Sequence, residues 1–147
     1  ILMLKRILFA SILCLFGATA VVSAENQHEN REAAMKKIGG AMGAIAGMAK
    51  GEKPFDAAVV KDSLTTISAT IKVFPDYFPA GSEMDDNEAS PAIWANMDDF
   101  KAHANKLSAD ADMLMAQLPA DAAGLGAVME TLGADCGACH KLYRLKK

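Results

Sequence analysis

Four stretches of this chain repeat apolar residues at alternating steps of three and four, the spacing of a helix with one buried face. They cover about residues 26–50, 55–73, 91–118 and 121–143. No stretch shows the strict alternation that is typical of a half-buried strand. Three of the stretches follow one another through short turns, so the sequence predicts an all-α protein, an antiparallel four-helix bundle.

The expected core residues lie on these four apolar faces. In the first stretch they are Met35, Ile38, Met42, Ile45 and either Met48 or Ala49, and in the second Ala57, Val60, Leu64, Ile67, Ile71 and Phe74. In the third they are Ile93, Trp94, Met97, Phe100, Ala104, Leu107, Ala111, Leu114 and Leu118. In the fourth they are Leu125, either Val128 or Met129, Leu132, Cys136, His140 and Tyr143. Each helix thus has one face to bury against the others.

The first 24 residues have the layout of a secretory signal peptide. Lys5 and Arg6 precede an apolar run at 7–16, and small residues at 22–24 predict cleavage before Glu25. The run is about ten residues long, against roughly 20 needed to span a bilayer, so no membrane anchor is expected after cleavage. We therefore expect a signal peptide at 1–24, and at 25–147 one soluble domain exported to the periplasm.

Charge and carboxylate spacing exclude several functions. Removal of Lys5 and Arg6 leaves 13 basic and 18 acidic residues. An acidic surface without a basic patch argues against a nucleic-acid partner, which needs a positive footprint. The paired aspartates at 85–86 and 98–99 are adjacent in sequence, and adjacent residues face different ways on a helix. We therefore expect that the protein is not an enzyme.

The two cysteines that remain after cleavage form the sequence Cys-Gly-Ala-Cys-His at 136–140. Cys-x-x-Cys-His is the attachment signature of c-type haem. On a helix, Cys136, Cys139 and His140 share one face, because they are three and four residues apart. The cysteines can then form thioethers to one haem, and His140 can be an axial ligand of its iron.

Two other uses of the cysteine pair fit the sequence less well. A structural zinc site needs four ligands, and His28 and His103 offer no second cluster. A thioredoxin-type dithiol belongs near a βαβ pattern, and no strand is expected here. A redox dithiol without haem nevertheless stays as a third class of function.

Met35 is the candidate for the second axial ligand. In an antiparallel bundle the end of the last helix lies beside the start of the first, so His140 should face residues early in the first stretch. Met35 is the methionine at that level of the apolar face. Methionine also fills cores flexibly, so an iron ligand and a wall of the pocket both remain open.

Two arginines are candidates for contact with the haem. Arg31 lies on the apolar face four residues before Met35, and a buried charge needs a partner such as a haem propionate. The alternative is an arginine that reaches solvent. Arg144 either covers the proximal face of the haem or complements the helix dipole. His28 and His103 do not fit the apolar faces of their helices, and we expect them at the surface.

The chain resembles the class II c-type cytochromes, cytochrome c′ and its low-spin relatives, over nearly all of residues 25–147. The resemblance rests on REAAMKKIGGAMGAIAGMAKG at 31–51, FPAGS at 78–82, PAIWANMDDF at 91–100 and CGACHKLYR at 136–144. It implies a four-helix bundle with one haem c on Cys136 and Cys139, His140 as axial ligand, Arg31 near a propionate, and residue 35 over the iron.

The resemblance also implies a function. In cytochrome c′ proper, residue 35 is usually apolar, and the five-coordinate iron binds nitric oxide or carbon monoxide. In the low-spin relatives a methionine there ligates the iron, and the protein carries electrons. Met35 favours an electron carrier that serves redox partner proteins, with a gas-binding cytochrome c′ as the alternative. Members of the family are often dimers paired through their first two helices, so a homodimer stands beside a monomer.

Overall fold

A computed structural model of the chain describes residues 24–83 and 88–146. The elements are α1 (Ala24–Ala49), α2 (Ala57–Val73), η1 (Phe74–Tyr77), α3 (Ala92–Ala95), α4 (Met97–Ala116), η3 (Ala122–Gly124) and α5 (Leu125–Tyr143). Residues 1–23 of the expected signal peptide lie outside the described residues, and its last residue, Ala24, is the first residue of α1. Cleavage before Glu25 stays a prediction. Among the described residues, no helix has the length and hydropathy that a membrane crossing requires.

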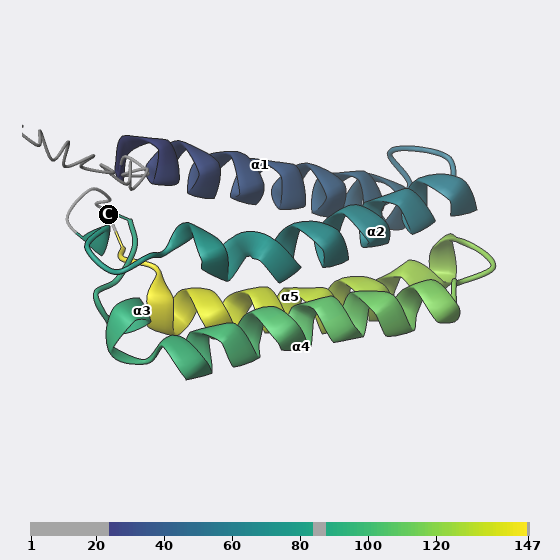
Figure 1. The fold of residues 1–147 in the computed structure, drawn as a ribbon. Helices are drawn as coiled ribbons and strands as arrows, with labels where there is room; N and C mark the ends of the chain where they lie inside the picture. The colour runs from purple at the N-terminus through teal and green to yellow at the C-terminus, as the bar shows by residue number, and fades with distance from the viewer. Residues whose placement is uncertain (1–23, 84–87, 147) are drawn as a thin grey trace, which may run out of the picture.

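The four long helices run alternately in opposite directions (Figure 1). α1 packs on α2, α2 on α4, α4 on α5, and α5 returns to α1. The start of α1, the end of α5, η1 and α3 therefore lie at one end of the bundle (Figure 1). This arrangement confirms the predicted antiparallel four-helix bundle.

The core follows the predicted apolar faces. The largest fully enclosed side chains come from α1, α2, α3 and α5: Ile45, Val60, Leu64, Ile67, Ile93, Leu125 and Leu132. α4 adds the buried Phe100 and Ala111. Ala57 is the exception on α2, because it lies exposed in the first turn. Gly51, with φ 74°, follows the last turn of α1, where the left-handed conformation ends a helix at little cost to glycine.

One predicted helix, at 91–118, is two helices in the structure. The backbone leaves helical geometry at Asn96, with φ −134° and ψ 48°, and α4 begins at the next residue. Asn96 Nδ2 donates to Ala92 O at 3.3 Å, a local bond of the kind by which asparagine competes with helix continuation. Trp94, in α3, donates from Nε1 to Pro79 O at 3.1 Å. The short α3 is thus tied to the preceding connection as well as packed on α4 and α5.

The first turn of α2 depends on one capping side chain. Asp56 Oδ1 accepts hydrogen bonds from the backbone N–H groups of Ala58 at 2.9 Å and Val59 at 3.3 Å. We expect Asp56→Ala to lower the free energy of unfolding by about 1 kcal/mol, the usual cost of a lost N-cap. Urea denaturation followed by circular dichroism measures this. Asp56→Asn is the control, because its amide oxygen still accepts and should preserve most of the stability.

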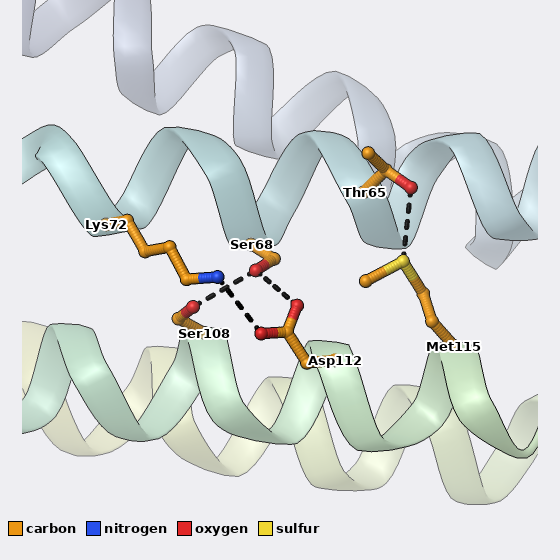
Figure 2. A network of polar contacts seen from close by, with 6 residues as sticks. All are labelled: Thr65, Ser68, Lys72, Ser108, Asp112 and Met115. Atoms are coloured by element: carbon orange, nitrogen blue, oxygen red, sulfur yellow. Dashed lines mark hydrogen bonds and ion pairs between the residues drawn. The ribbon is translucent and has the colours of Figure 1, made fainter.

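A polar network joins α2 to α4 on the side of the bundle shown in Figure 2. Ser68 Oγ donates to Asp112 Oδ1 at 2.6 Å and lies 3.0 Å from Ser108 Oγ. Lys72 Nζ donates to the other carboxylate oxygen of Asp112 at 3.0 Å. The hydrogen bond from Ser68, and then that from Lys72, hold the pKa of Asp112 below its ordinary value of 3.8.

This lowered pKa makes the stability of the α2–α4 contact depend on pH. Because the folded state binds the Asp112 proton more weakly than the unfolded state, the network stabilises the fold above pH 3.8 and loses that contribution as the pH falls through the lower folded-state pKa. We expect Asp112→Asn to reduce the acid-induced drop in the urea midpoint. Asp98→Asn, at an exposed carboxylate in the first turn of α4, is the matched control and should leave the drop in place.

Candidate functional site

A cavity of about 450 Å³ opens at the end of the bundle where α1 starts and α5 ends. Its volume lies within the range of small-molecule and cofactor sites, about 300–1,000 Å³. The apolar part of its lining comes from α1, α2, η1 and α4 and includes Ile38, Ile71, Phe74, Phe78, Phe100, Ala104 and Leu107. The candidate site residues predicted from the sequence all line it as well: Arg31, Met35, Cys136, Cys139, His140 and Arg144.

Three of those candidates lie on one turn of α5. Cys136, Cys139 and His140 all line the cavity, as helical spacing predicted. Both cysteines are half-buried and are not joined in a disulfide. His140 lines the cavity while much of its side chain remains exposed to solvent. The structure thus presents two thiols and one imidazole to the same space.

Burial shifts the ionisation of all three groups towards their neutral forms. It raises the pKa of Cys136, with the Asp135 charge adding to the effect. It raises the pKa of Cys139 to about 11, aided by Cys136 and Asp99. Burial and then the charge of Arg144 lower the pKa of His140 below its ordinary value. Neutral imidazole is the form that binds a metal.

Met35 lies on α1 and lines the same cavity as His140. Its side chain is half-buried. Gly39, one turn further along α1, also lines the cavity, and a Cβ there would meet no other atom within 4 Å. Met42 lines the cavity deeper in the bundle. The structure therefore brings Met35 and the α5 residues together, as the antiparallel arrangement required.

Arg31 is buried, with 4% of its surface exposed. Its Nε donates to Tyr77 O at 2.8 Å, and its Nη2 donates to Ser82 Oγ at 2.7 Å. Nη1 lies at a longer 3.5 Å from Ser82 O. Arg31 lines the cavity, and the structure excludes the alternative of an arginine that extends into solvent.

Arg144 follows the last turn of α5 and is exposed, although it lines the cavity. Its backbone pairs with that of Ala89 in an isolated antiparallel bridge. On either side of it, Ser90 N donates to Tyr143 O at 3.0 Å and Leu145 N donates to Glu88 O at 2.8 Å. The connection that precedes α3 thus holds the end of α5 in place.

Tyr143 anchors the same end of α5 to α4. Its hydroxyl donates to Asp99 Oδ2, and burial together with that hydrogen bond raises the pKa of Tyr143 to about 12. His103 Nε2 lies 3.6 Å from the same Asp99 oxygen. The His103 and Tyr143 rings meet edge to face at 5.9 Å. The last turn of α5, which carries His140, is therefore held on two sides: Tyr143 bonds to α4, and the backbone at Arg144 pairs with the connection before α3.

The expectation that His28 and His103 are surface residues is wrong. Both are half-buried and line the cavity. The sequence contains the signal for His103, because it lies three residues after Phe100 and four before Leu107, on the same helical face. His28 lies three residues before Arg31, within reach of the same face of α1. Sequence reasoning counted only apolar residues on these faces and so missed both.

The cavity fits a covalently attached haem. Its apolar walls suit a porphyrin, and its polar residues supply two thiols for attachment and an imidazole and a thioether as iron ligands. All of these come from α1 and α5, which face one another across the cavity. The absence of a Cβ at Gly39 leaves additional room at the wall beside Met35.

Comparisons with known proteins agree with this site. A family model described as Cytochrome C' matches residues 26–144. A protein named cytochrome c-556 from Agrobacterium fabrum is 57% identical over 98% of this chain and 97% of its own length. A cytochrome c' from Pararhodospirillum photometricum is 35% identical over 83% of this chain and 98% of its own. The solved structure of cytochrome c' from Rhodopseudomonas palustris has a TM-score of 0.77 at 36% identity and covers 82% of this chain and 97% of that one.

Proposed function

This chain belongs to the cytochrome c′ family of class II c-type cytochromes, which carry covalently attached haem c, and on that premise we propose that it is a monohaem electron carrier with two protein ligands to iron. The observation that carries the proposal is the shared cavity of Met35 and His140, which lie on α1 and α5. When bound, the haem supplies the one-electron redox couple. The protein supplies attachment, axial ligands and an apolar surrounding.

Each site residue has one role in this proposal. Cys136 and Cys139 form the thioethers, and the neutral His140 is the proximal ligand. Met35 is the second axial ligand, and its thioether sulfur raises the reduction potential. With both axial positions filled by the protein, electron transfer requires little rearrangement around the iron.

The two arginines place positive charge at the mouth of the cavity. We propose that Arg31, which lines the cavity, contributes its positive charge to binding a haem propionate. Arg144 covers the proximal side, where its charge already lowers the pKa of His140. The role of Arg31 follows from the charge-assisted hydrogen bonds that arginine forms with carboxylates.

Periplasmic location and redox partner proteins belong to the same proposal. They rest on the signal peptide expected at 1–24 and on the electron-carrier function. The monomer and the homodimer remain alternatives that sedimentation of the haem-loaded protein distinguishes.

The absorption spectrum of the oxidised and reduced protein, with and without carbon monoxide, tests the proposal. Ligation by sulfur predicts a low-spin spectrum with a sulfur-to-iron charge-transfer band when oxidised, and a reduced spectrum that carbon monoxide leaves unchanged. A high-spin spectrum that changes at once with carbon monoxide would overturn it. The pyridine haemochrome assay of the same sample checks covalent attachment and would end the dithiol interpretation.

A five-coordinate, gas-binding cytochrome c′ is the second candidate. It is favoured by the 36% identity to a solved cytochrome c' and the 35% identity to another. In that case Met35 would only form the wall of the cavity. The higher identity of 57% is to a relative named cytochrome c-556 rather than cytochrome c', which supports the electron carrier.

A further inference from the structure

The segment 77–82 is joined to α1 by one buried side chain, Arg31. Five residues take part in what we term the Arg31 cluster: Arg31, Tyr77, Phe78, Ser82 and Trp94. They come from α1, the segment 77–82 and α3, which are distant in sequence. The propionate contact proposed for Arg31 does not explain its bonds to Tyr77 and Ser82, which join α1 to this segment.

The polar half of the cluster is a continuous chain of hydrogen bonds. Arg31 Nη2 donates to Ser82 Oγ at 2.7 Å, and Ser82 Oγ donates onward to Pro79 O at 2.7 Å. Trp94 Nε1 donates to the same Pro79 O at 3.1 Å. Gly81, with φ 88°, provides the turn that brings Ser82 back over Pro79. Ser82 is 3% exposed, and its bond with Arg31 is buried, whereas the bond from Trp94 to Pro79 O is exposed.

The aromatic half of the cluster connects Arg31 to the cavity wall. The guanidinium carbon lies 4.2 Å from the Phe78 ring centroid and 5.4 Å from that of Trp94, within the range of cation–π attraction. Phe78 in turn meets the rings of Phe74 at 5.1 Å and Phe100 at 5.0 Å. These three phenylalanines line the cavity. Arg31 thus holds one wall of the cavity against α1.

Arg31 precedes Met35 by four residues, or about one helical turn. The bonds of Arg31 therefore fix the same part of α1 that carries Met35. They draw α1 towards Phe78 and the aromatic wall at the end of the bundle where the cavity opens. Release of Arg31 would free both the start of α1 and the segment 77–82.

We propose that Arg31 is a positioning residue that keeps the Met35 side of the cavity closed and so slows the entry of diatomic ligands. This inference rests on the proposed haem site in the cavity, but not on the choice between the two coordination states. The bidentate fork of arginine is essential, because lysine offers only a point charge on a flexible stem. Ser82 is essential because its Oγ accepts a hydrogen bond from Arg31 and donates one to Pro79 O.

Carbon monoxide association with the reduced, haem-loaded protein measures this closure. Because Met35 on the iron would block carbon monoxide, every rate is measured in a Met35→Ala background, which is the parent protein of this experiment. Stopped-flow mixing gives the rate for this parent, and for the parent with Arg31→Lys, with Ser82→Ala or with both. The matched control is Ser68→Ala, which also removes a buried serine hydroxyl with two hydrogen-bond partners but lies on α2, away from the cavity. Hydrogen–deuterium exchange of residues 77–82 in the same samples reports whether the segment has been released.

We expect Ser82→Ala and Arg31→Lys each to accelerate carbon monoxide association about tenfold, since the loss of a buried hydrogen bond to a charged group shifts an equilibrium by about that factor. Exchange at 77–82 should accelerate in parallel. The double variant should match the single ones, because both residues act through the same chain of hydrogen bonds. Ser68→Ala should leave both readouts near those of the Met35→Ala parent.

Three results would overturn the inference: association rates in Arg31→Lys and Ser82→Ala that match the Met35→Ala parent, equal acceleration in Ser68→Ala, or single effects that multiply when Arg31→Lys and Ser82→Ala are combined. Failure of the proposed function is seen elsewhere, in the absence of the charge-transfer band from the unsubstituted protein. The ratio of rates is measured with Met35 already replaced, so it does not depend on whether Met35 ligates the iron, and the two failures are distinguishable.

Discussion

Under the proposed ligation, replacement of Met35 by alanine is expected to convert a carbon-monoxide-insensitive electron carrier into a five-coordinate, gas-binding protein. The methyl group of alanine cannot reach the space that the methionine sulfur occupies, so the iron would lose its second axial ligand. We expect the charge-transfer band to disappear and the reduced protein to bind carbon monoxide at once. The reduction potential should fall, because axial ligation is a main control of haem potentials, which span roughly 0.8 V.

Met42→Ala is the matched control for this change. Met42 also lies on α1, is half-buried and lines the cavity, but it is nearly two helical turns further from the start of the helix. It should keep the charge-transfer band and the potential. If Met35→Ala also kept both, Met35 would be a wall of the cavity and the second axial ligand would have to be sought elsewhere.

Replacement of Phe100 by alanine is expected to lower the free energy of unfolding by about 3–5 kcal/mol, the usual cost of removing a large aromatic side chain from a core. Phe100 is 2% exposed. Its ring lies 5.0 Å from that of Phe78, 5.2 Å from that of Tyr143 and 6.1 Å from that of Phe74. One substitution thus removes contacts with the connection, with α5 and with η1.

Urea denaturation of the haem-loaded protein, followed by circular dichroism, measures this loss. Val73→Ala is the control, because Val73 is 45% exposed and surface substitutions usually change stability by less than about 0.5 kcal/mol. A loss below about 1 kcal/mol for Phe100→Ala would contradict the central place of this ring, since core truncations of this size seldom cost so little.

The bundle and the cysteine–histidine face were readable from local spacing. Leu64, Ile67 and Ile71 recur at three and four residues, and this recurrence alone identifies the buried face of α2. Cys136, Cys139 and His140 lie within five residues, so their shared helical face follows from helix geometry without any knowledge of the remaining chain. The antiparallel order then placed Met35 opposite His140, because short turns leave little choice of direction.

The break at Asn96 was not readable in this way. The apolar spacing of Ile93, Met97 and Phe100 suits one continuous helix as well as two. The break depends on the bond of Asn96 to Ala92 O and on that of Trp94 to Pro79 O. The bond between Trp94 and Pro79 joins residues 15 positions apart. The spacing of apolar residues within one helix therefore cannot predict it.

By itself, the sequence determined the long helices, their buried faces, the antiparallel order and the shared face of Cys136, Cys139 and His140, because each depends on residues near one another along the chain. Only the tertiary structure decided the surroundings of Arg31, His28 and His103. A charged or polar side chain on an apolar face can turn to solvent, to a cofactor or to another segment, and the choice depends on which distant groups lie within bonding distance. For Arg31 those groups are Tyr77 O and Ser82 Oγ, which the fold places beside α1.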